Sequence, residues 1–371
     1  MILWHRRDHA SLCRALTARM SYPRAMHRKK IASSLIVIAA ACVSLVACSP
    51  PPAGSPEIAL SGPTMGTTYS VKVASPPAGI DSNAVRVAID DVLARIDLDM
   101  SGYRDDSTVS RFNASTSTDW FAVSEDLAKV VSESLQVSEL SQGALDITVA
   151  PLVNLWGMGP AGEQAQLPSD AEIQRALART GYRKLQVRMS PAALRKEIPE
   201  LTIDLNAVAP GYAVDLLASR FASMDIGNFM IDIGGEVRAR GLNGKGQVWR
   251  IAVERPIDAE EEPYAVVRLD DLSVTTSGEY RHYIVRDGHR YSHTIDPRTG
   301  RPVEHDLASV VVATGTALQA DAWATALNVL GAEAGYALAR ERNMAAMFIV
   351  ASGGELHDEM TEAFRRLVIA E

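Results

Sequence analysis

Cysteine is scarce in this sequence, and the positions of its cysteines leave no disulfide. The chain has three of them, Cys13, Cys42 and Cys48. Residues 1–47 have the pattern of a secretory signal peptide, in which Arg28, Lys29 and Lys30 precede an uncharged apolar run. Cleavage before Cys48 leaves one cysteine in the mature protein, so no disulfide can form within the chain and the fold must be stable through packing alone. Hydrophobic residues make up 47% of the chain, which is sufficient for a large core.

The end of the apolar run predicts how the protein is anchored. The sequence Leu45-Val46-Ala47-Cys48 resembles the lipobox of bacterial lipoproteins, in which the cysteine is lipidated and becomes the first residue. A transmembrane anchor is the alternative, but the run is short for a hydrocarbon layer of about 30 Å. We therefore expect Cys48 to hold a lipid anchor.

This signal divides the chain into three parts. Residues 1–47 are the signal, and the patternless stretch 1–25 suggests that translation starts at Met26. Residues 48–58 hold the lipidated cysteine and a proline-rich tether. Residues 59–371 are expected to form the folded domain.

Positive charge is depleted once the signal is removed. Residues 1–48 hold eight of the 37 Lys and Arg and one of the 45 Asp and Glu, which leaves 29 basic against 44 acidic side chains. The mature protein then has a net charge of −15. Such a balance argues against nucleic acid as a partner and against electrostatic adhesion to anionic lipid.

The common nucleotide-binding motifs are absent, since the chain has neither a GxGxxG nor a Walker pattern. It also has no internal repeat. Hydrophobic periodicity predicts helices at 83–98, 124–141, 170–180 and 319–342, and strands at 69–73, 201–205, 229–233, 248–253, 265–269, 280–285 and 309–313. Gly234 and Gly235 predict a hairpin turn. Strands that cluster between helix-rich flanks predict one α+β domain with two lobes and mixed antiparallel sheets flanked by helices.

One stretch near the C-terminus, residues 291–302, concentrates groups that move protons and hold anions. It contains His293, Asp296, Arg298 and Arg301. Loops that only connect strands rarely need so many such groups. The sequence Asp-Pro-Arg-Thr-Gly is equally typical of a tight turn, because proline presets φ and glycine accepts a positive φ. The stretch alone does not distinguish an active-site loop from a turn.

The last predicted helix contains a candidate metal site. Asp321 and Thr325 lie four residues apart, so their oxygens share one helical face. A carboxylate and a hydroxyl are hard ligands that suit Mg²⁺. A capped or solvated helix face is the alternative. The neighbouring residues are mostly apolar, which makes an idle carboxylate costly and favours the metal site.

Two earlier segments combine small or apolar residues with isolated polar groups. Met65 stands between glycines, where its adaptable side chain suits a flat ring, although for this segment alone a core methionine in a strand-entry loop is the preferred explanation. Asp146 lies in the apolar stretch 143–157 and could reach a ligand. Alternatively, Asp146 and Asn154 cap backbone groups.

Residues 204–215 read as a strand that passes into a helix, with Pro210 in the first helical turn. The free amides at such a junction favour anions.

Taken together and in this order, these segments resemble the ApbE family of bacterial FAD:protein FMN transferases. The resemblance covers nearly all of residues 60–367. It rests on residues 64–67, 100–103 with 110–113, 146–148 with 154–157, 232–235, 292–297 and 320–322.

The resemblance implies both a fold and a function. The fold would be a single ApbE-like, T-fold-like domain. The enzyme would be Mg²⁺-dependent, split FAD, attach the FMN half to a threonine of a partner protein through a phosphoester, and release AMP. Family members are lipoproteins on the periplasmic side of the membrane, and their acceptors are flavin-carrying subunits of membrane redox complexes.

The resemblance also implies roles for individual residues. Asp321 and Thr325 match metal-binding side chains, the Ala207 carbonyl matches a third metal ligand, and His293 matches the base. A histidine base agrees with the chemistry, because its pKa suits proton removal from a threonine hydroxyl. The positions that match FAD contacts are Met65, Tyr103, Ala144, Leu145, Asp146, Asp204 and Ile295. Many relatives have Lys or Glu where this chain has Pro210, so one polar contact to the nucleotide is absent or is supplied elsewhere.

Two other functions remain open from the sequence. An FAD pyrophosphatase that gives FMN and AMP needs the same metal and phosphate site, with water in place of the threonine. A non-catalytic FAD-binding lipoprotein needs only the pocket.

Overall fold

The computed structural model describes residues 56–160, 162, 166–256, 263–278, 283–286 and 289–369. They belong to one compact unit, Ser55–Glu371. The predicted signal peptide, the predicted lipidation site Cys48, most of the predicted tether and part of the strand predicted at 280–285 lie outside the described residues. Within the described ranges, no helix has both the length and the apolar character needed to cross a membrane.

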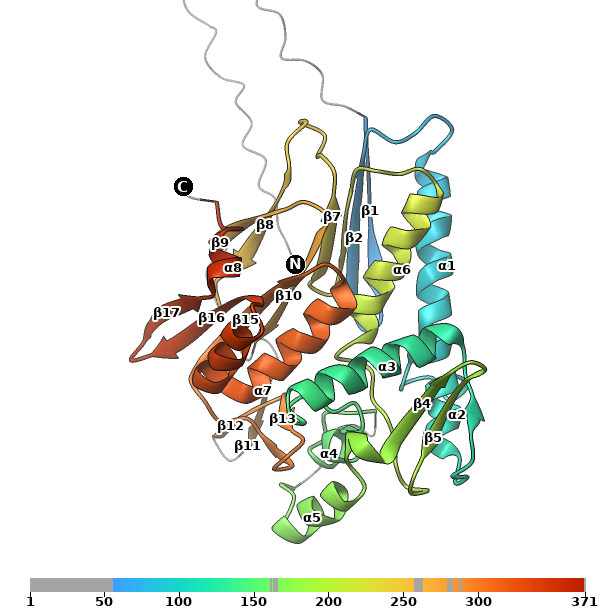
Figure 1. The fold of residues 1–371 in the computed structure, drawn as a ribbon, viewed down its shortest axis with the longest axis vertical. Helices are drawn as coiled ribbons and strands as arrows, with labels where there is room; N and C mark the ends of the chain where they lie inside the picture. Colours follow the sequence, from blue (N-terminus) through green and yellow to red (C-terminus); the bar gives the residue numbers. More distant parts are fainter. Residues whose placement is uncertain are drawn as a thin grey trace, which may run out of the picture. The chain divides into compact units, whose positions relative to one another are not determined.

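An eight-stranded sheet forms the centre of this unit (Figure 1), in the order β1-β2-β6-β7-β10-β15-β16-β17. Each neighbouring pair in this sheet is antiparallel. The strands are Glu57–Thr64 (β1), Thr67–Ala74 (β2), Phe229–Ile233 (β6), Glu236–Arg240 (β7), Leu272–Gly278 (β10), Leu307–Thr314 (β15), Ala345–Ser352 (β16) and Glu355–Met360 (β17).

The two faces of the sheet are covered differently. One face packs through residues such as Ile231 against three helices, α1 (Ser82–Met100), α6 (Ala209–Ser223) and α7 (Ala317–Glu341). The other face packs through residues such as Met230 against strands β8 (Trp249–Glu254) and β9 (Pro263–Leu269) and helix α8 (Glu362–Arg365). Successive side chains of a strand point to opposite faces, so Met230 and Ile231 enter different cores.

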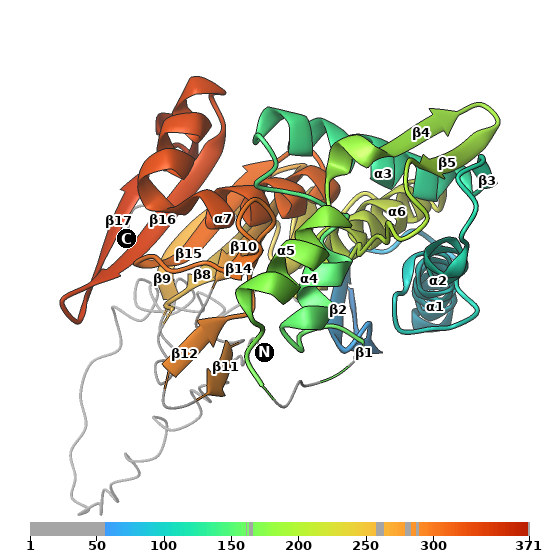
Figure 2. The same ribbon diagram turned by 90° about the horizontal axis from the view of Figure 1, so that it is seen from below.

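A smaller set of elements forms the second lobe. Its three-stranded sheet has the order β3-β5-β4 and lies at the opposite end of the domain from β16 and β17 (Figure 2). The elements are α2 (Thr108–Ala114), β3 (Phe121–Ala122), α3 (Glu125–Leu140), α4 (Ala150–Leu155), α5 (Asp170–Ala178), the 3-10 turn η1 (Tyr182–Lys184), β4 (Leu185–Met189) and β5 (Ala192–Lys196). Two short hairpins follow β10, namely β11 (Tyr283–Arg286) with β12 (His289–Ser292), and β13 (Ile295–Asp296) with β14 (Arg301–Pro302).

A buried lysine holds the second lobe together. Lys196 is 1% exposed, and its ammonium group donates hydrogen bonds of 3.1 Å to the carbonyls of Phe112 and Leu201. The nitrogen also lies 5.0 Å from the centroid of the Phe112 ring. Burial lowers the pKa of this amine. Lys196 thus fastens α2 and the chain after β5 to the small sheet.

Several sequence predictions are confirmed, beginning with the α+β class. Ser169 and Glu172 form the capping box of α5, each accepting a hydrogen bond from the backbone of the other. Pro210 lies in the first turn of α6. Gly234 and Gly235, with φ of 72° and 112°, make the turn between β6 and β7.

The strand predicted at 201–205 is wrong. Its alternate residues Leu201, Ile203 and Leu205 are buried, as the pattern requires, but the segment belongs to no sheet among the described residues. The side-chain amide of Asn113 takes the place of a partner strand. It donates to the Ile203 carbonyl at 2.9 Å and accepts from the Ile203 amide at 2.8 Å. The next amide, of Asp204, donates to the Ile147 carbonyl at 2.7 Å.

Other features also differ from the predicted elements. Helix α7, predicted as continuous, is interrupted at Gly331, where φ is 76° and ψ is −179°. Strand β1 was not predicted, because its start adjoins the proline-rich tether.

Candidate functional site

Two hairpin turns lie side by side at the same end of the strands of the large sheet. The β1–β2 turn contains Met65, with φ of 47°, and the β6–β7 turn contains Gly234 and Gly235. Because β2 pairs with β6, the turns are neighbours, and the Gly234 amide donates to the Thr68 carbonyl at 3.0 Å. This contact places the β1–β2 turn beside the β6–β7 turn.

Carboxylates gather behind these turns. Asp232 is the second-to-last residue of β6, Glu236 begins β7, and Asp321 on α7 is 5% exposed. Burial and the charge of Asp232 raise the pKa of Glu236 to about 8. Burial and the charge of Glu236 raise the pKa of Asp321 well above its ordinary value, although a hydrogen bond from Gly211 opposes the shift. Within the part of the chain that the structure describes, neither Glu236 nor Asp321 has an ion-pair partner.

Asp321 is held against the start of α6. Its Oδ2 accepts a hydrogen bond of 3.2 Å from the Gly211 amide. A Cβ at position 211 would lie 2.5 Å from the Ala317 carbonyl oxygen and 2.9 Å from the Asp321 Cβ, so only glycine permits this approach. Ala207 lies two residues before α6. The Gly211 amide therefore joins the start of α6 to Asp321, the predicted carboxylate ligand.

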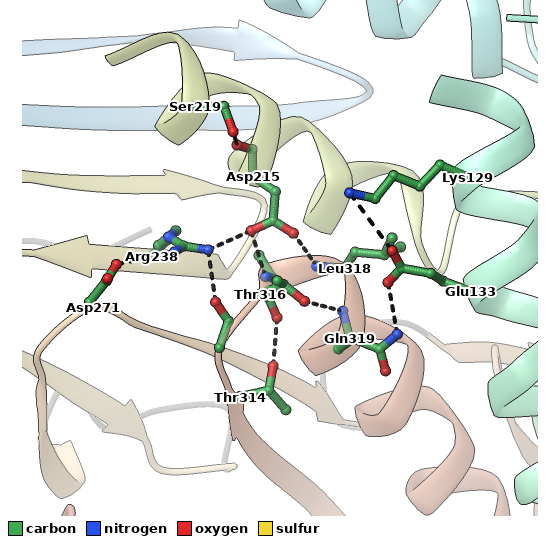
Figure 3. Close-up of polar contacts among 12 residues, drawn as sticks. Lys129, Glu133, Asp215, Ser219, Arg238, Asp271, Thr314, Thr316, Leu318 and Gln319 are labelled. Atoms are coloured by element: carbon green, nitrogen blue, oxygen red, sulfur yellow. Dashed lines mark hydrogen bonds and ion pairs between the residues drawn. The ribbon is translucent and has the colours of Figure 1, made fainter. Parts of the chain in front are cut away.

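The beginning of α7 is fixed by Asp215 of α6 (Figure 3). The Asp215 carboxylate accepts hydrogen bonds of 2.9 Å from the amides of Ala317 and Leu318, and it pairs at 2.9 Å with Arg238 of β7. Arg238 also donates to Gly315 and to Asp271. These groups line a surface pocket of about 290 Å³ to which none of the predicted site residues contributes. Asp215 thus sets the position of α7, and with it the position of Asp321.

The stretch around His293 is a set of side-chain-supported turns. The Ser292 hydroxyl accepts from the Thr294 amide at 2.9 Å, and the Thr294 carbonyl accepts from the Val303 amide at 3.0 Å. His293, between these two residues, is half-buried. Ile295 is buried in a small cluster with Trp156.

The rest of this stretch is the predicted turn. Asp296 accepts from the Arg298 amide at 2.9 Å and pairs with its guanidinium at 2.8 Å. Arg301 pairs with Asp170 of α5. Gly300 has φ of 73°, and a Cβ there would lie 2.7 Å from Ile173. Both arginines are therefore engaged with carboxylates of this chain.

Asp146 carries out the backbone-capping role that was the alternative to ligand binding. Its Oδ1 accepts from the Thr148 amide at 2.8 Å and from the Thr148 hydroxyl, and its Oδ2 accepts from the Tyr182 amide at 2.8 Å. Burial raises its pKa. The adjoining Ala144 and Leu145 are buried as well. Asp204 lies beside this segment through its bond to Ile147, and burial raises its pKa too.

Tyr103 occupies the connection between α1 and α2 and is 63% exposed. Its amide donates to the Ser101 hydroxyl at 3.2 Å. An exposed aromatic side chain of this size is available for contact with another molecule. Among the predicted site residues, Tyr103 and Asp146 are the two whose surroundings differ most, one accessible and the other enclosed by backbone amides.

The sequence analysis did not assign a role to Glu236. The signal that could have found it is the pair of acidic residues that flank Gly234 and Gly235, because a tight hairpin turn brings both to the same end of the two strands, although the register places Asp232 and Glu236 on opposite faces of the sheet.

A divalent cation fits the arrangement at the α6–α7 crossing. A group of three or more His, Cys, Asp and Glu side chains arranged to hold a metal does not occur in the described ranges. The available donors are instead hard oxygens, from the Asp321 carboxylate, the Thr325 hydroxyl and the Ala207 carbonyl, which suit Mg²⁺. A cation there would offset the repulsion that raises the pKa of Asp321 and Glu236.

Comparison with known proteins agrees with this fold. The ApbE family model matches residues 65–348. A Vibrio cholerae protein named FAD:protein FMN transferase is 40% identical over 330 residues, which cover 89% of this chain and 97% of that protein. An Escherichia coli protein of the same name is 38% identical over 352 residues, with 92% and 99% covered.

Solved structures agree as well. The flavin transferase ApbE of Vibrio cholerae, in a variant with a histidine replaced by glycine, superposes with a TM-score of 0.79 at 40% identity. The match covers 84% of this chain and 100% of the Vibrio cholerae chain. The chain therefore shares the α+β fold of a class of transferase enzymes. It belongs to the ApbE family.

Proposed function

We propose that this protein transfers FMN from FAD to a threonine hydroxyl of a partner protein in a Mg²⁺-dependent reaction that releases AMP. The observation that carries the proposal is the crossing of α6 and α7. There a buried carboxylate, Asp321, accepts a hydrogen bond from the Gly211 amide at the start of α6 and lies within electrostatic reach of Glu236. The names of the relatives, FAD:protein FMN transferase, supply the substrate class.

FAD would be held by residues from both lobes. Met65 offers an adaptable apolar contact at the β1–β2 turn, and Tyr103 offers an accessible ring. Ala144, Leu145 and Asp146 would form a buried wall. Asp204 and Ile295 would complete the site from the neighbouring segments. Because Asp146 has both oxygens on backbone amides, we assign it to shaping this wall as much as to contacting the nucleotide.

Mg²⁺ would be held by Asp321, Thr325 and the Ala207 carbonyl. Bound there, it would neutralise diphosphate charge and stabilise the leaving AMP. The free backbone amides at the start of α6 would favour the negative charge of the diphosphate. Pro210 does not disturb the helix there, because the first helical turn does not need its missing N–H donor.

His293 would take the proton of the acceptor threonine. The threonine oxygen then forms a bond to the FMN phosphorus, the bond from that phosphorus to the bridging oxygen breaks, and AMP leaves with the bridging oxygen. A neutral imidazole is suited to this step near neutral pH. Arg298 and Arg301 each pair with a carboxylate of this chain, so we assign neither a part in this step.

The location of the reaction follows from the N-terminus. A lipid on Cys48 would hold the domain on the periplasmic side of a bacterial membrane, with the proline-rich tether as a spacer. An acceptor there would be a flavin-carrying subunit of a membrane redox complex.

The test uses the purified full-length protein in detergent with FAD, Mg²⁺ and a threonine-bearing acceptor. Transfer gives flavin fluorescence that stays with the denatured acceptor, together with one AMP per flavin. The same acceptor with its threonine replaced by valine is the control and should remain unlabelled. Free FMN with AMP and no labelled acceptor would replace the proposal with hydrolysis. Unchanged FAD would replace it with simple flavin binding.

A further inference from the structure

Asn328 connects two parts of the candidate site that are distant in sequence. It is fully buried on α7, at 0% exposure. It lies seven residues after Asp321 and three after Thr325, so the three side chains share one side of the helix. Its side-chain amide donates to the Thr294 hydroxyl at 3.3 Å and to the Ser277 hydroxyl at 3.2 Å. Thr294 directly follows His293.

The backbone of Asn328 is fixed as well as its side chain. The interruption of α7 at Gly331 takes away the helical donor that the Asn328 carbonyl would otherwise have. His305 replaces that donor, because its Nε2 lies 2.7 Å from the backbone carbonyl oxygen of Asn328. A Cβ at position 331 would lie 3.0 Å from the His305 ring, so glycine also makes room for this contact. Asn328 therefore has little freedom to rotate or shift.

The loop end of the connection is equally well supported. Thr294 is held through its amide by Ser292 and through its carbonyl by Val303. Its hydroxyl is the group that reaches α7. The hydrogen bond between Asn328 and Thr294 thus joins α7 to the turn at residues 292–294, and each of the two is also held by other hydrogen bonds.

We infer that Asn328 is a positioning residue, which sets the placement of the His293 loop relative to the metal-binding side of α7. The inference rests on the proposed function, in which His293 is the base and Asp321 a metal ligand. A displacement of about 1 Å in a reacting group can cost about 10²-fold in rate. A buried amide that spans the two elements prevents such a displacement.

The first test measures order and needs no turnover. Asn328→Leu keeps a similar shape but removes both donors. Amide hydrogen exchange in residues 292–303 should become at least several-fold faster in this variant, whereas exchange in residues 317–325 should not change. Ser277→Ala is the matched control, because it removes the other acceptor and leaves the Thr294 bond in place. Unchanged exchange in 292–303, or an equal increase throughout the domain, would overturn the inference.

The second test is a double-mutant cycle in the transfer assay. Asn328→Leu and Thr294→Val should each lower kcat by about 10- to 100-fold, with the KM for FAD within about threefold of its original value. The double variant should be no slower than the slower single variant, because both remove the same bond. Thr294→Ser, which keeps the hydroxyl, should restore most of kcat. Additive losses, or a failure of serine to restore kcat, would contradict the inference.

The two tests separate this inference from the proposed function. Failure of the unmodified protein to label any acceptor would count against the proposed function, while the exchange experiment would still decide whether Asn328 orders the loop. Normal transfer by Asn328→Leu with normal exchange would reject the positioning role alone.

Discussion

Gly211 of α6 and Asp321 of α7 are in direct contact, and the contact depends on the absence of a side chain at position 211. The Gly211 amide donates to Asp321 Oδ2 at 3.2 Å, and a Cβ on Gly211 would lie 2.9 Å from the Asp321 Cβ. Gly211→Ala should therefore force the helices apart and destabilise the protein by about 1–3 kcal/mol. It should also weaken Mg²⁺ binding, because the carboxylate moves with α7.

Urea unfolding and Mg²⁺ titration calorimetry measure the two effects of Gly211→Ala. Gly227→Ala is a suitable control, since a Cβ there would meet no atom within 4 Å. Equal stability and equal Mg²⁺ affinity in both variants would show that the crossing tolerates the added methyl group.

Asp321→Asn should have opposite effects on Mg²⁺ binding and on the stability of the metal-free protein. The variant removes the charge with little change of shape, so we expect Mg²⁺ affinity and Mg²⁺-dependent turnover to be lost. The metal-free protein should be at least as stable as before, because the repulsion with Glu236 is relieved. Calorimetry with Mg²⁺ and unfolding in EDTA measure both quantities. Asp90→Asn, an exposed change on α1, is the control. Full turnover in Asp321→Asn would remove Asp321 from the metal site.

His293→Ala should leave FAD binding in place and remove transfer. Loss of a general base lowers kcat by about 10²- to 10⁴-fold, whereas ground-state affinity depends on other contacts. Fluorescence titration with FAD and the acceptor-labelling assay distinguish the two effects. His357→Ala, at an exposed position of β17, should behave like the unmodified protein. If His293→Ala instead lost FAD binding, the histidine would be structural.

The stability of the metal-free protein should fall as the pH rises. The pKa of Glu236 is raised from 4.5 to about 8 in the folded state. Between these values the folded protein keeps a proton that the unfolded chain releases, so folding is favoured at low pH and loses this contribution as the pH approaches 8. The loss should be on the order of 4 kcal/mol between pH 4.5 and pH 8.

Urea unfolding in EDTA across this range of pH measures the slope. Glu236→Gln removes the titrating group and should flatten it. Added Mg²⁺ should raise the stability most at the high-pH end, where the carboxylates are ionised. A slope that is the same with and without Glu236 would assign the titration to another group.

The sequence predicts well those features that a local interaction determines. Ser169 caps α5 because its hydroxyl and the Glu172 carboxylate are three residues apart. Gly234 and Gly235 turn the chain because they accept positive φ. Asp321 and Thr325 share a side of α7 through helical spacing alone.

Features that depend on distant partners could not be read from the sequence. Residues 201–205 alternate like a strand and bury the expected side chains, yet their hydrogen bonds go to Asn113 and Ile147. The interruption at Gly331 lies within an apolar helical pattern, and it is accommodated by His305 from another loop. Glu236 joins the candidate site because β7 packs beside α7, and this packing cannot be read from the order of residues.

Lys196, whose ammonium group joins α2 and the chain after β5 to the small sheet, can report how often the second lobe opens. Other amines on the surface react readily with acylating reagents, but this one is enclosed between two carbonyls and an aromatic ring. A reagent can label it only when α2 and the chain after β5 separate from the small sheet. The rate of labelling at this one lysine, read by mass spectrometry, therefore measures how often the second lobe opens.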